Sequence, residues 1–375
     1  MKVLFNCISS VSGGGQAYLK NISSLLAFRF QDEQRHELFF LAHIAQAELL
    51  YGVPEKNMIW ISGSRPEGLH RIVWERRNLS RILDELSIDV LFTPYQVATH
   101  IKSVKNVLMI RNMEPFLFGG FKYSISTWLR NKILANMSAD CLSSADRVIG
   151  VSQFASDYLS RTNLSSNRIK TIYHGSPLLP QFASTQFDRL VKLGICSDFI
   201  FTCGSMLPYR RCEDVIRAFN LCIPYLPDNI FLVIAGTGTD AGYARMISKL
   251  INASPRPSRI LTLGSVPWVT MVELYQHCKI CVIATEIEAC PNIALEAMAA
   301  GCSIISSNIP PLPEIFDQCA ISYEARDVFD LSQKILNLIN DKNLREKLSN
   351  KAVLRARDFS WSDCVDKTYS ALTDW

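Results

Sequence analysis

The chain has 375 residues, 48% hydrophobic and 20% charged, which is enough for two domains with real cores and excludes extended disorder. A net charge of +4, with no dense basic stripe and no recognisable nucleic-acid motif, argues against nucleic acid as a partner. The twelve cysteines are scattered through hydrophobic runs, and the first residues follow a strand pattern and not that of a signal peptide. We therefore expect a cytoplasmic protein with reduced thiols and no membrane-spanning segment.

Short apolar runs alternate with helical patterns along both halves of the chain. In the first half we predict a helix over residues 68–86, another after the first strand, and strands at 3–8, 38–41, 58–61, 90–92, 107–110, 148–151 and 171–173. In the second half we predict helices at 213–220, 242–250, 271–278, 293–300 and from 330 onward, and strands at 199–203, 230–235, 260–263, 280–284 and 303–306. Strands rich in Val, Ile and Leu and separated by helices predict parallel sheets covered on both faces.

The pattern breaks at residues 175–180, where Gly and Pro gather, and we place the domain junction there. The predicted domains are 1–177, 178–358 and a terminal helix at 359–375. The fold class is therefore α/β, with two doubly wound, Rossmann-like domains facing a central cleft. Sheets of this kind bind ligands beyond the carboxyl ends of their strands, so we expect the active site in that cleft.

Glycines follow several of the predicted strands. Gly14 and Gly15 lie in a run after the first strand, and Gly204 and Gly236 follow two strands of the second half. Glycine lets a backbone approach a ligand closely, and the start of a following helix offers N–H groups to phosphates. Simple turn geometry is the competing explanation at each position.

Two arginines stand at the start of a predicted helix in the second half. Arg210 and Arg211 come after the strand that ends near Gly204. A guanidinium group presents a planar fork of donors that suits phosphate oxygens. A pyrophosphate held by Arg210 would lose negative charge and become a better leaving group. The alternative is a pair of solvated surface arginines.

The segment 286–301 is the richest in possible chemistry. Glu288 lies just before a predicted helix, and Glu296 lies about one turn beyond Asn292. Two carboxylates on one rim of a cleft could accept hydrogen bonds from sugar hydroxyls, and the helix start at Asn292 and Ile293 would add N–H donors. On composition alone, a capping role for Glu288 and a surface position for Glu296 are the favoured explanation.

Two weaker signals stay open. Aromatic and basic residues alternate over 114–134, which suits a membrane interface, a packed core or the wall of an acceptor site. Cys278 and Cys281 match CxxC, but no second pair lies at zinc spacing, so we expect buried thiols and no metal site. The basic residues are in excess in the N-terminal half, which allows contact with an anionic membrane surface or an acidic substrate, and a solvated charged surface explains it equally well.

Taken in order, these motifs resemble the family 4 retaining glycosyltransferases, which have the GT-B fold. The resemblance rests on Glu288-x7-Glu296 with the Ala-Met-Ala-Ala-Gly run that follows, and it extends over nearly the whole chain through residues 151–154, 171–175, 208–219 and 359–361. It implies that the first domain binds the acceptor and the second a nucleotide-sugar. It also implies that the terminal helix crosses back to the first domain.

The resemblance implies a role for each matching residue. Glu288 would steady charge near the anomeric carbon of the donor sugar, Arg210 would hold the diphosphate, and Glu296 would bind the ribose hydroxyls. Further donor contacts would come from Gly14, Gly15, Gly204, Arg211, Gly236, Asn292 and Ile293. Arg111 and Asn112 would lie on the acceptor side, and neither a metal nor a cofactor would be required.

Some positions depart from the family pattern. Arg210 stands where lysine is usual, Arg111-Asn112 where histidine is common, and Ala289–Ile293 replace a glycine–aromatic–glycine run. We expect a retaining transferase that moves a sugar from a nucleoside-diphosphate sugar to a saccharide or lipid-linked acceptor, in surface polysaccharide, lipopolysaccharide or glycolipid synthesis, at the inner face of the membrane. One alternative is a sugar-nucleotide 2-epimerase, which would need more cleft carboxylates and histidines. The other is an inactive binding subunit.

Overall fold

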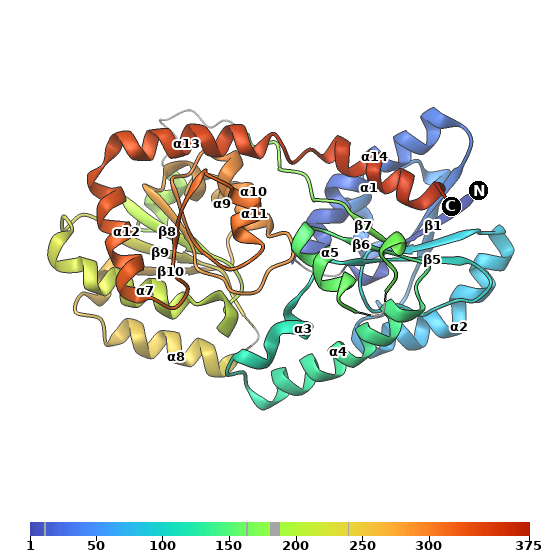
Figure 1. Cartoon of the computed structure of the whole chain (residues 1–375), viewed down its shortest axis with the longest axis horizontal. Coiled ribbons are helices and arrows are strands. Elements are labelled where there is room, and N and C mark those ends of the chain that lie inside the picture. The colour runs from blue at the N-terminus through green and yellow to red at the C-terminus, as the bar shows by residue number, and fades with distance from the viewer. Residues whose placement is uncertain (11–12, 163, 181–187, 239) are drawn as a thin grey trace. The chain divides into compact units, whose positions relative to one another are not determined.

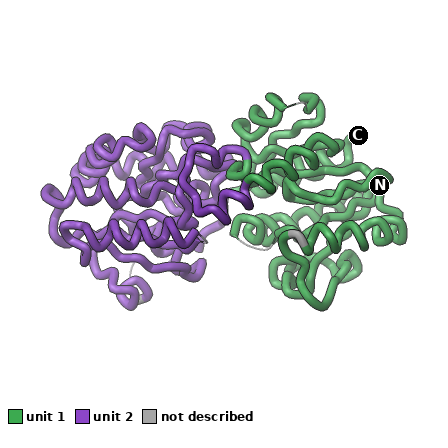
Figure 2. The backbone as a smooth tube through the Cα atoms, turned by 90° about the horizontal axis from the view of Figure 1, so that it is seen from below, with its two compact units in different colours: residues 1–115, 132–175, 360–375 green, residues 116–131, 176–359 purple. Residues whose placement is uncertain are grey.

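The computed structural model describes residues 1–10, 13–162, 164–180, 188–238 and 240–375. They form two compact units, coloured separately in Figure 2. Unit 1 contains residues 1–115, 132–175 and 360–375, and unit 2 contains residues 116–131 and 176–359. The predicted junction at 177/178 falls close to the observed change of unit at 175/176. The segment 116–131, which the sequence pattern assigned to the first domain, clusters with unit 2 instead.

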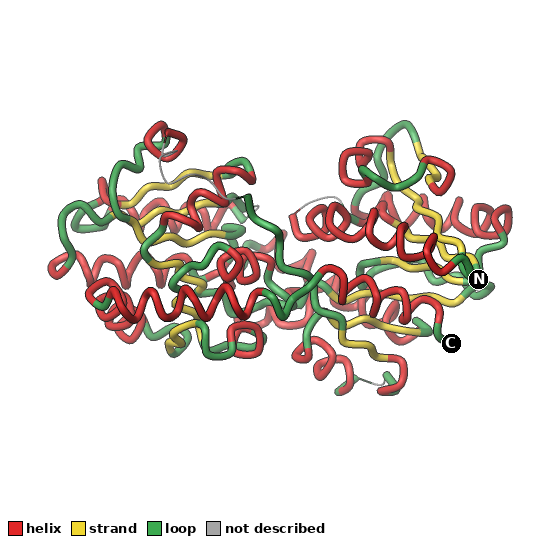
Figure 3. Tube along the Cα trace, turned by 90° about the horizontal axis from the view of Figure 1, so that it is seen from above, coloured by secondary structure: helices red, strands yellow, loops and turns green. Residues whose placement is uncertain are grey.

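Unit 1 is built on a parallel sheet of seven strands in the order β3-β2-β1-β4-β5-β6-β7. Its strands are β1 (Lys2–Asn6), β2 (Glu37–His43), β3 (Met58–Ile61), β4 (Val90–Thr93), β5 (Lys105–Ile110), β6 (Arg147–Gly150) and β7 (Ile169–Thr171). Helices α1 (Gly13–Glu33), α2 (Gly68–Leu86), α5 (Gln153–Ser160) and α14 (Trp361–Thr373) belong to unit 1. Helices α3 (Glu114–Leu117) and α4 (Ile125–Ser144) each have residues in both units, since 116–131 belongs to unit 2. Figure 1 labels most of these elements, and Figure 3 shows the strands of each unit flanked by helices.

Unit 2 is built on a parallel sheet of six strands in the order β10-β9-β8-β11-β12-β13. Its strands are β8 (Phe199–Cys203), β9 (Phe231–Ala235), β10 (Ile260–Gly264), β11 (Ile280–Ile283), β12 (Ile304–Ser307) and β13 (Ala320–Tyr323). Its helices are α6 (Asp188–Lys192), α7 (Cys212–Cys222), α8 (Ala241–Asn252), α9 (Trp268–His277), α10 (Asn292–Ala299), α11 (Leu312–Phe316), α12 (Val328–Asn340) and α13 (Lys342–Ala356). The prediction of two doubly wound α/β domains is confirmed.

Burial of the central strands explains why their sequences are continuously apolar. Val3, Leu4 and Phe5 of β1 are fully buried, and the Phe5 ring packs against Phe40 and Phe92 at centroid distances of 5.3 and 4.8 Å. Burying one such side chain contributes about 1.5–3 kcal/mol to folding. Because helices cover both faces of a parallel sheet, the side chains on both sides of each central strand are apolar, and the sequence does not alternate between apolar and polar residues.

Each sheet has one point where the strand order reverses. In unit 1 the chain leaves β1 toward β2 and β3 and returns on the other side at β4. In unit 2 the same reversal lies between β8 and β11. Loops leaving the carboxyl ends of such neighbouring strands diverge and open a ligand crevice. The loops after β1, β4, β8 and β11 are therefore where functional side chains are expected.

The last helix of the chain belongs to unit 1. α14 begins at a Ser360 cap and packs along α1, with the Tyr369 ring edge-on to Phe30 and Arg29 paired with Asp366 at 2.8 Å. Gly175 lies against the first turn of α14, where its missing side chain leaves room for Trp361. None of the helices among the described residues has the length and apolar character to span a bilayer.

Candidate functional site

Arg210 and Glu288 meet at the β8/β11 reversal point of unit 2. Arg210 ends the short 3-10 turn Pro208–Arg210 after β8, and Glu288 lies in the loop between β11 and α10. The Nη1 of Arg210 donates a hydrogen bond to Oε1 of Glu288, and its Nε lies 3.4 Å from Oγ of Ser205. The Glu286 N–H donates to the Tyr209 carbonyl at 2.8 Å and ties the two loops together. Two predicted site residues are thus in direct contact.

This ion pair is largely shielded from water, with the Arg210 side chain 19% and the Glu288 side chain 10% exposed. Burial raises the pKa of the Glu288 carboxyl, although Arg210 pulls it the other way. Burial also works against the charge of Arg210, but Glu288, Tyr209 and Cys203 together raise the pKa of the guanidinium. Each group is therefore the charged partner of the other, and an anion bound by Nη1 of Arg210 would have to displace the Glu288 carboxylate.

Glu296 lies on the helix that follows Glu288, and it has a partner that the sequence did not reveal. The Tyr275 hydroxyl of α9 donates to Oε2 of Glu296 at 3.0 Å and also lies 3.0 Å from Sγ of Cys203. Burial raises the pKa of Glu296 to about 7, against the opposing hydrogen bond from Tyr275. The sequence predicted a helix over 271–278 but gave no role to Tyr275, because its hydroxyl contact is not encoded by spacing.

The N-terminus of α10 adds backbone donors beside Glu288. Asn292 and Ile293 are its first two residues, and the first bond of the helix runs from the Ala294 N–H to the Pro291 carbonyl at 3.0 Å. The N–H groups of Asn292 and Ile293 precede that bond, at the positive end of the helix dipole. An anionic or hydroxyl-rich ligand near Glu288 would meet these donors.

The glycines after β8 and β9 allow two turns to touch. Gly236 has a φ of +127°, and a Cβ built on it would lie 1.9 Å from the carbonyl oxygen of Gly204, which has a φ of +135°. The N–H of Gly204 donates to Ala235 and that of Gly236 donates to Gly264, at 3.0 and 2.7 Å. Close backbone packing therefore requires glycine at 236, the positive φ favours glycine at 204, and their contact with a donor stays a prediction.

Arg211 lies beside Arg210 but has a different environment. It adopts a left-handed backbone conformation, with a φ of +52°, and pairs with Glu213, Asp214 and Glu286 at 2.9, 2.8 and 3.2 Å. Arg326 also holds Glu286, at 2.9 Å. Arg211 thus has three carboxylate partners, and its predicted donor contact remains untested. Glu286 and Arg326 could not be predicted from the sequence, because their contacts join segments 40 or more residues apart.

In unit 1, Arg111 gathers the loops at the corresponding edge of the sheet. Its guanidinium donates to the Pro94 carbonyl at 2.8 Å, to the Gly14 carbonyl at 3.3 Å and to Oγ of Ser10 at 3.3 Å. Burial lowers the pKa of Arg111 to about 10. A Cβ on Gly15 would lie 3.2 Å from Cα of Ser10, so the glycine keeps the start of α1 close to the loop.

Asn112 follows Arg111 and shapes the next turn. Its Oδ1 accepts from the Glu114 N–H at 2.9 Å, and its carbonyl accepts from Nε2 of Gln96 at 3.0 Å. The structure therefore brings Gly14, Gly15, Arg111 and Asn112 to one edge of the unit 1 sheet. The acceptor-side role of Arg111 and Asn112 stays a prediction.

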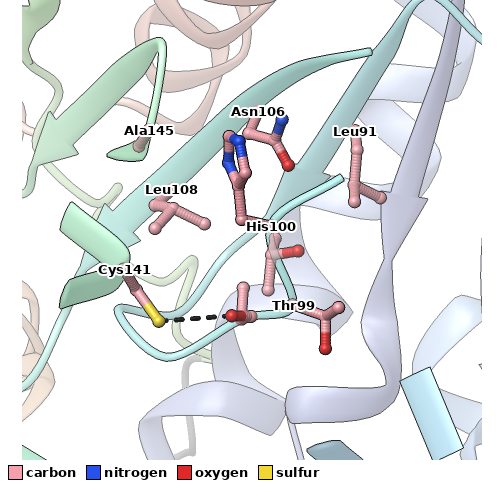
Figure 4. A pocket seen from close by; sticks show the side chains of 9 residues that line it. Leu91, Thr99, His100, Asn106, Leu108, Cys141 and Ala145 are labelled. Atoms are coloured by element: carbon pink, nitrogen blue, oxygen red, sulfur yellow. Dashed lines mark hydrogen bonds between the residues drawn. The ribbon is translucent and has the colours of Figure 1, made fainter. Parts of the chain in front are cut away.

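A small pocket in unit 1 lies apart from these residues. Figure 4 shows Leu91, Asn106 and Leu108 on its strand side, with Cys141 of α4 donating to the Ala98 carbonyl at 3.2 Å. None of the predicted site residues lines it. The loops at the carboxyl ends of the strands, and not this pocket, are the candidate site.

Two family models match the chain in succession. The model described as Glycosyltransferase Family 4 matches residues 13–178, and the model described as Glycosyl transferases group 1 matches residues 196–355. The second match contains Arg210, Glu288 and Glu296, and the first contains Gly14, Gly15 and Arg111.

Relatives with curated names are distant. The O-antigen chain mannosyltransferase B of Escherichia coli is 25% identical over 237 residues, which is 62% of this chain and 61% of that protein. The match thus spans less than two thirds of that relative. An uncharacterized glycosyltransferase of Haemophilus influenzae is 19% identical over 360 residues, which is 95% of each chain.

Solved structures agree in fold over the full length. HepE of Anabaena, crystallised with UDP-glucose, superposes with a TM-score of 0.75 at 16% identity, covering 99% of this chain and 98% of that one. WaaG, a glycosyltransferase involved in lipopolysaccharide biosynthesis, superposes with a TM-score of 0.72 at 13% identity over 100% of both chains. With the two sheets and the two successive family matches, these comparisons establish that the chain belongs to the family 4 glycosyltransferases, which have the two-domain GT-B fold.

Proposed function

We propose that this protein transfers a sugar from a nucleoside-diphosphate sugar to a saccharide or lipid-linked acceptor, in the synthesis of a surface polysaccharide or lipopolysaccharide. Family membership supports sugar transfer, and relatives named as O-antigen mannosyltransferases support this class of product. Structural neighbours crystallised with UDP and UDP-glucose support a nucleotide-sugar as donor.

The observation that carries the proposal is the Arg210–Glu288 pair at the β8/β11 reversal point. A half-buried cation, a half-buried carboxylate and a helix N-terminus together would suit an anion attached to a polyhydroxylated ring. Glu296, four residues along α10 from Asn292, adds a second carboxylate for ribose hydroxyls. A purely structural ion pair would not require this second carboxylate on the helix that follows Glu288.

The residues suggest how transfer would proceed. Arg210 would leave Glu288 for the diphosphate, and its positive charge would stabilise the nucleoside diphosphate as it departs. Glu288, released from Arg210, would then face the sugar and stabilise positive charge developing at the anomeric carbon. We further propose retention of configuration by front-face attack, in which the departing phosphate accepts the proton of the acceptor hydroxyl. No metal or cofactor is required in this scheme.

Unit 1 would supply the acceptor side. Arg111 holds the loops after β1, β4 and β5 in place, and Asn112 shapes the turn beside them. Gly14 leaves the start of α1 open to a ligand oxygen. We propose that a saccharide or lipid-linked acceptor binds along this edge of unit 1.

The first turns of α4 support contact with a membrane surface, at the cytoplasmic side. Ile125, Trp128 and Leu129 occupy one side of the helix and are 87%, 43% and 52% exposed, and Lys122 and Arg130 lie beside them. An apolar stripe with basic flanks suits the interface of an anionic bilayer. A lipid-linked acceptor would be reached from such a position.

The test is an assay of nucleoside-diphosphate release with a panel of UDP- and GDP-sugars, with and without acceptor glycans. We expect acceptor-dependent release from one donor, and an α-linked product from an α-linked donor by NMR. Glu288→Gln should abolish turnover, whereas Glu346→Gln, an exposed carboxylate on α13, should leave it unchanged. Epimerised donor without acceptor, or an inverted product, would contradict the proposal.

A further inference from the structure

Two cysteines meet where α9 and α10 end. Cys278 is the residue after α9 and lies just before β11, and Cys302 follows α10 and lies just before β12. Because β11 and β12 are parallel neighbours, their starts lie at the same edge of the sheet. That edge is opposite the loops that carry Arg210 and Glu288.

The two thiols share one acceptor. Their Sγ atoms are 3.9 Å apart, and Cys278 and Cys302 donate to the Tyr275 carbonyl at 3.3 and 3.0 Å. This carbonyl lies in the last turn of α9. In a longer helix it would accept from the Lys279 N–H, but that N–H donates to the Phe199 carbonyl instead. The thiols therefore cap the end of α9.

Tyr275 connects this cap to the candidate site. Its side chain is 1% exposed, and its hydroxyl bonds to Glu296 at 3.0 Å while its carbonyl receives the two thiols. A movement of the last turn of α9 must therefore change the hydrogen bond between Tyr275 and Glu296. Since α10 also carries Glu296 and ends next to Cys302, both helices that hold this contact end at the thiol pair.

The pair differs in access. Cys278 is partly exposed, whereas Cys302 is buried with 2% exposure, and burial raises the pKa of the Cys302 thiol. An oxidant thus meets Cys278 first. Over the described residues, no group of three or more His, Cys, Asp or Glu side chains is arranged to hold a metal ion.

We propose that Cys278 and Cys302 form an oxidisable pair whose disulfide loosens the Tyr275–Glu296 contact and weakens nucleotide binding, an inference that rests on the proposed function of Glu296. Hydrogen peroxide converts the Cys278 thiol to a sulfenic acid and releases one water. The Cys302 sulfur then attacks the Cys278 sulfur, the S–O bond breaks, and a second water leaves with the Cys302 proton.

The geometric consequence follows from bond lengths. The sulfur atoms must approach from 3.9 Å to about 2.05 Å, and both S–H donors to the Tyr275 carbonyl are lost. The bond that the proposal expects to loosen is the one between Tyr275 and Glu296, and losing one net hydrogen bond typically changes an equilibrium constant about fivefold. We expect UDP to bind about fivefold more weakly to the oxidised protein.

The experiment treats the full chain with hydrogen peroxide, blocks free thiols and maps disulfides by mass spectrometry. A Cys278–Cys302 cross-link should form, should reverse with dithiothreitol and should be absent in Cys278→Ser. Hydrogen exchange over residues 268–277 should rise on oxidation, and calorimetry should show weaker UDP binding. Cys196→Ser, which removes an exposed thiol elsewhere, should behave as the wild type.

Two results would overturn the inference. One is the absence of a Cys278–Cys302 cross-link after peroxide treatment, whether Cys196 is oxidised instead or Cys302 pairs with Cys281. The other is a formed cross-link with unchanged hydrogen exchange in α9. If the reduced protein binds no nucleotide, the proposed function fails, while the cross-link and the exchange still decide the redox pair.

Discussion

The raised pKa of Glu296 makes the stability of the protein depend on pH in a predictable direction. Its pKa is about 7 in the folded chain, against 4.5 for an unperturbed carboxyl. The folded state therefore binds a proton more tightly than the unfolded state. The contribution of Glu296 to stability is full below pH 4.5 and is lost as the pH rises toward 7.

The size of this loss follows from linkage. Between pH 5 and pH 8 the ionisation of Glu296 should cost the wild type up to about 2.5 kcal/mol of folding free energy. Glu296→Gln is always neutral and can still accept the hydrogen bond from Tyr275. The variant should therefore gain up to about 2.5 kcal/mol relative to the wild type over this pH range.

Urea unfolding of both proteins at pH 5 and pH 8 measures the difference directly. Comparing the two proteins cancels every other titrating group that they share. Glu346→Gln serves as the control, because its carboxylate is 61% exposed, and it should track the wild type at both pH values. If the curves of Glu296→Gln and the wild type stay parallel between pH 5 and pH 8, the assignment of a buried, proton-binding Glu296 is refuted.

Other consequences can be checked separately. UDP binding near pH 7 should release about half a proton, because ribose hydroxyls favour the ionised form of Glu296. Calorimetry in buffers of different ionisation enthalpy measures this proton release, and Glu296→Gln should show none. Gly236→Ala should cost about 3 kcal/mol or more, read as a lower urea midpoint, since its Cβ would lie 1.9 Å from the Gly204 oxygen. Gly175→Ala should cost about 2 kcal/mol and raise hydrogen exchange in α14, because its Cβ would lie 2.3 Å from Cγ of Trp361. Arg210→Ala should weaken UDP binding at least tenfold by calorimetry.

The sequence predicted the fold because its evidence is local. Buried strands of a parallel sheet must be apolar throughout, and helices follow most of them, so strand and helix positions can be read in order. The family resemblance predicted from Glu288-x7-Glu296 is confirmed by two successive family matches. The segment 116–131 was assigned to the wrong unit. It includes the first turns of α4, and nothing in the local sequence shows that these turns group with unit 2 while the rest of α4 groups with unit 1.

Within the candidate site, the sequence predicted which residues lie at strand ends but not how each is bonded. The contact between Arg210 and Glu288 follows from topology, since β8 and β11 are neighbours. The Tyr275–Glu296 bond depends on the rotation of two helices about their axes, which hydrophobic spacing fixes only approximately. Arg211 looked equivalent to Arg210, and only its left-handed backbone turns it toward Glu213, Asp214 and Glu286.

The charge arrangement also bears on whether a metal is needed. A diphosphate brings two or more negative charges. Arg210 contributes one positive charge and the α10 N-terminus about half of one, and together they offset most of the diphosphate charge once Glu288 turns away from Arg210. We therefore expect turnover to survive EDTA and to be insensitive to added Mg²⁺ or Mn²⁺. In Arg210→Ala this compensation is gone, so a divalent ion should partly restore binding in the variant alone. Loss of wild-type activity in EDTA, with recovery on adding Mg²⁺, would show that Arg210 and α10 do not suffice.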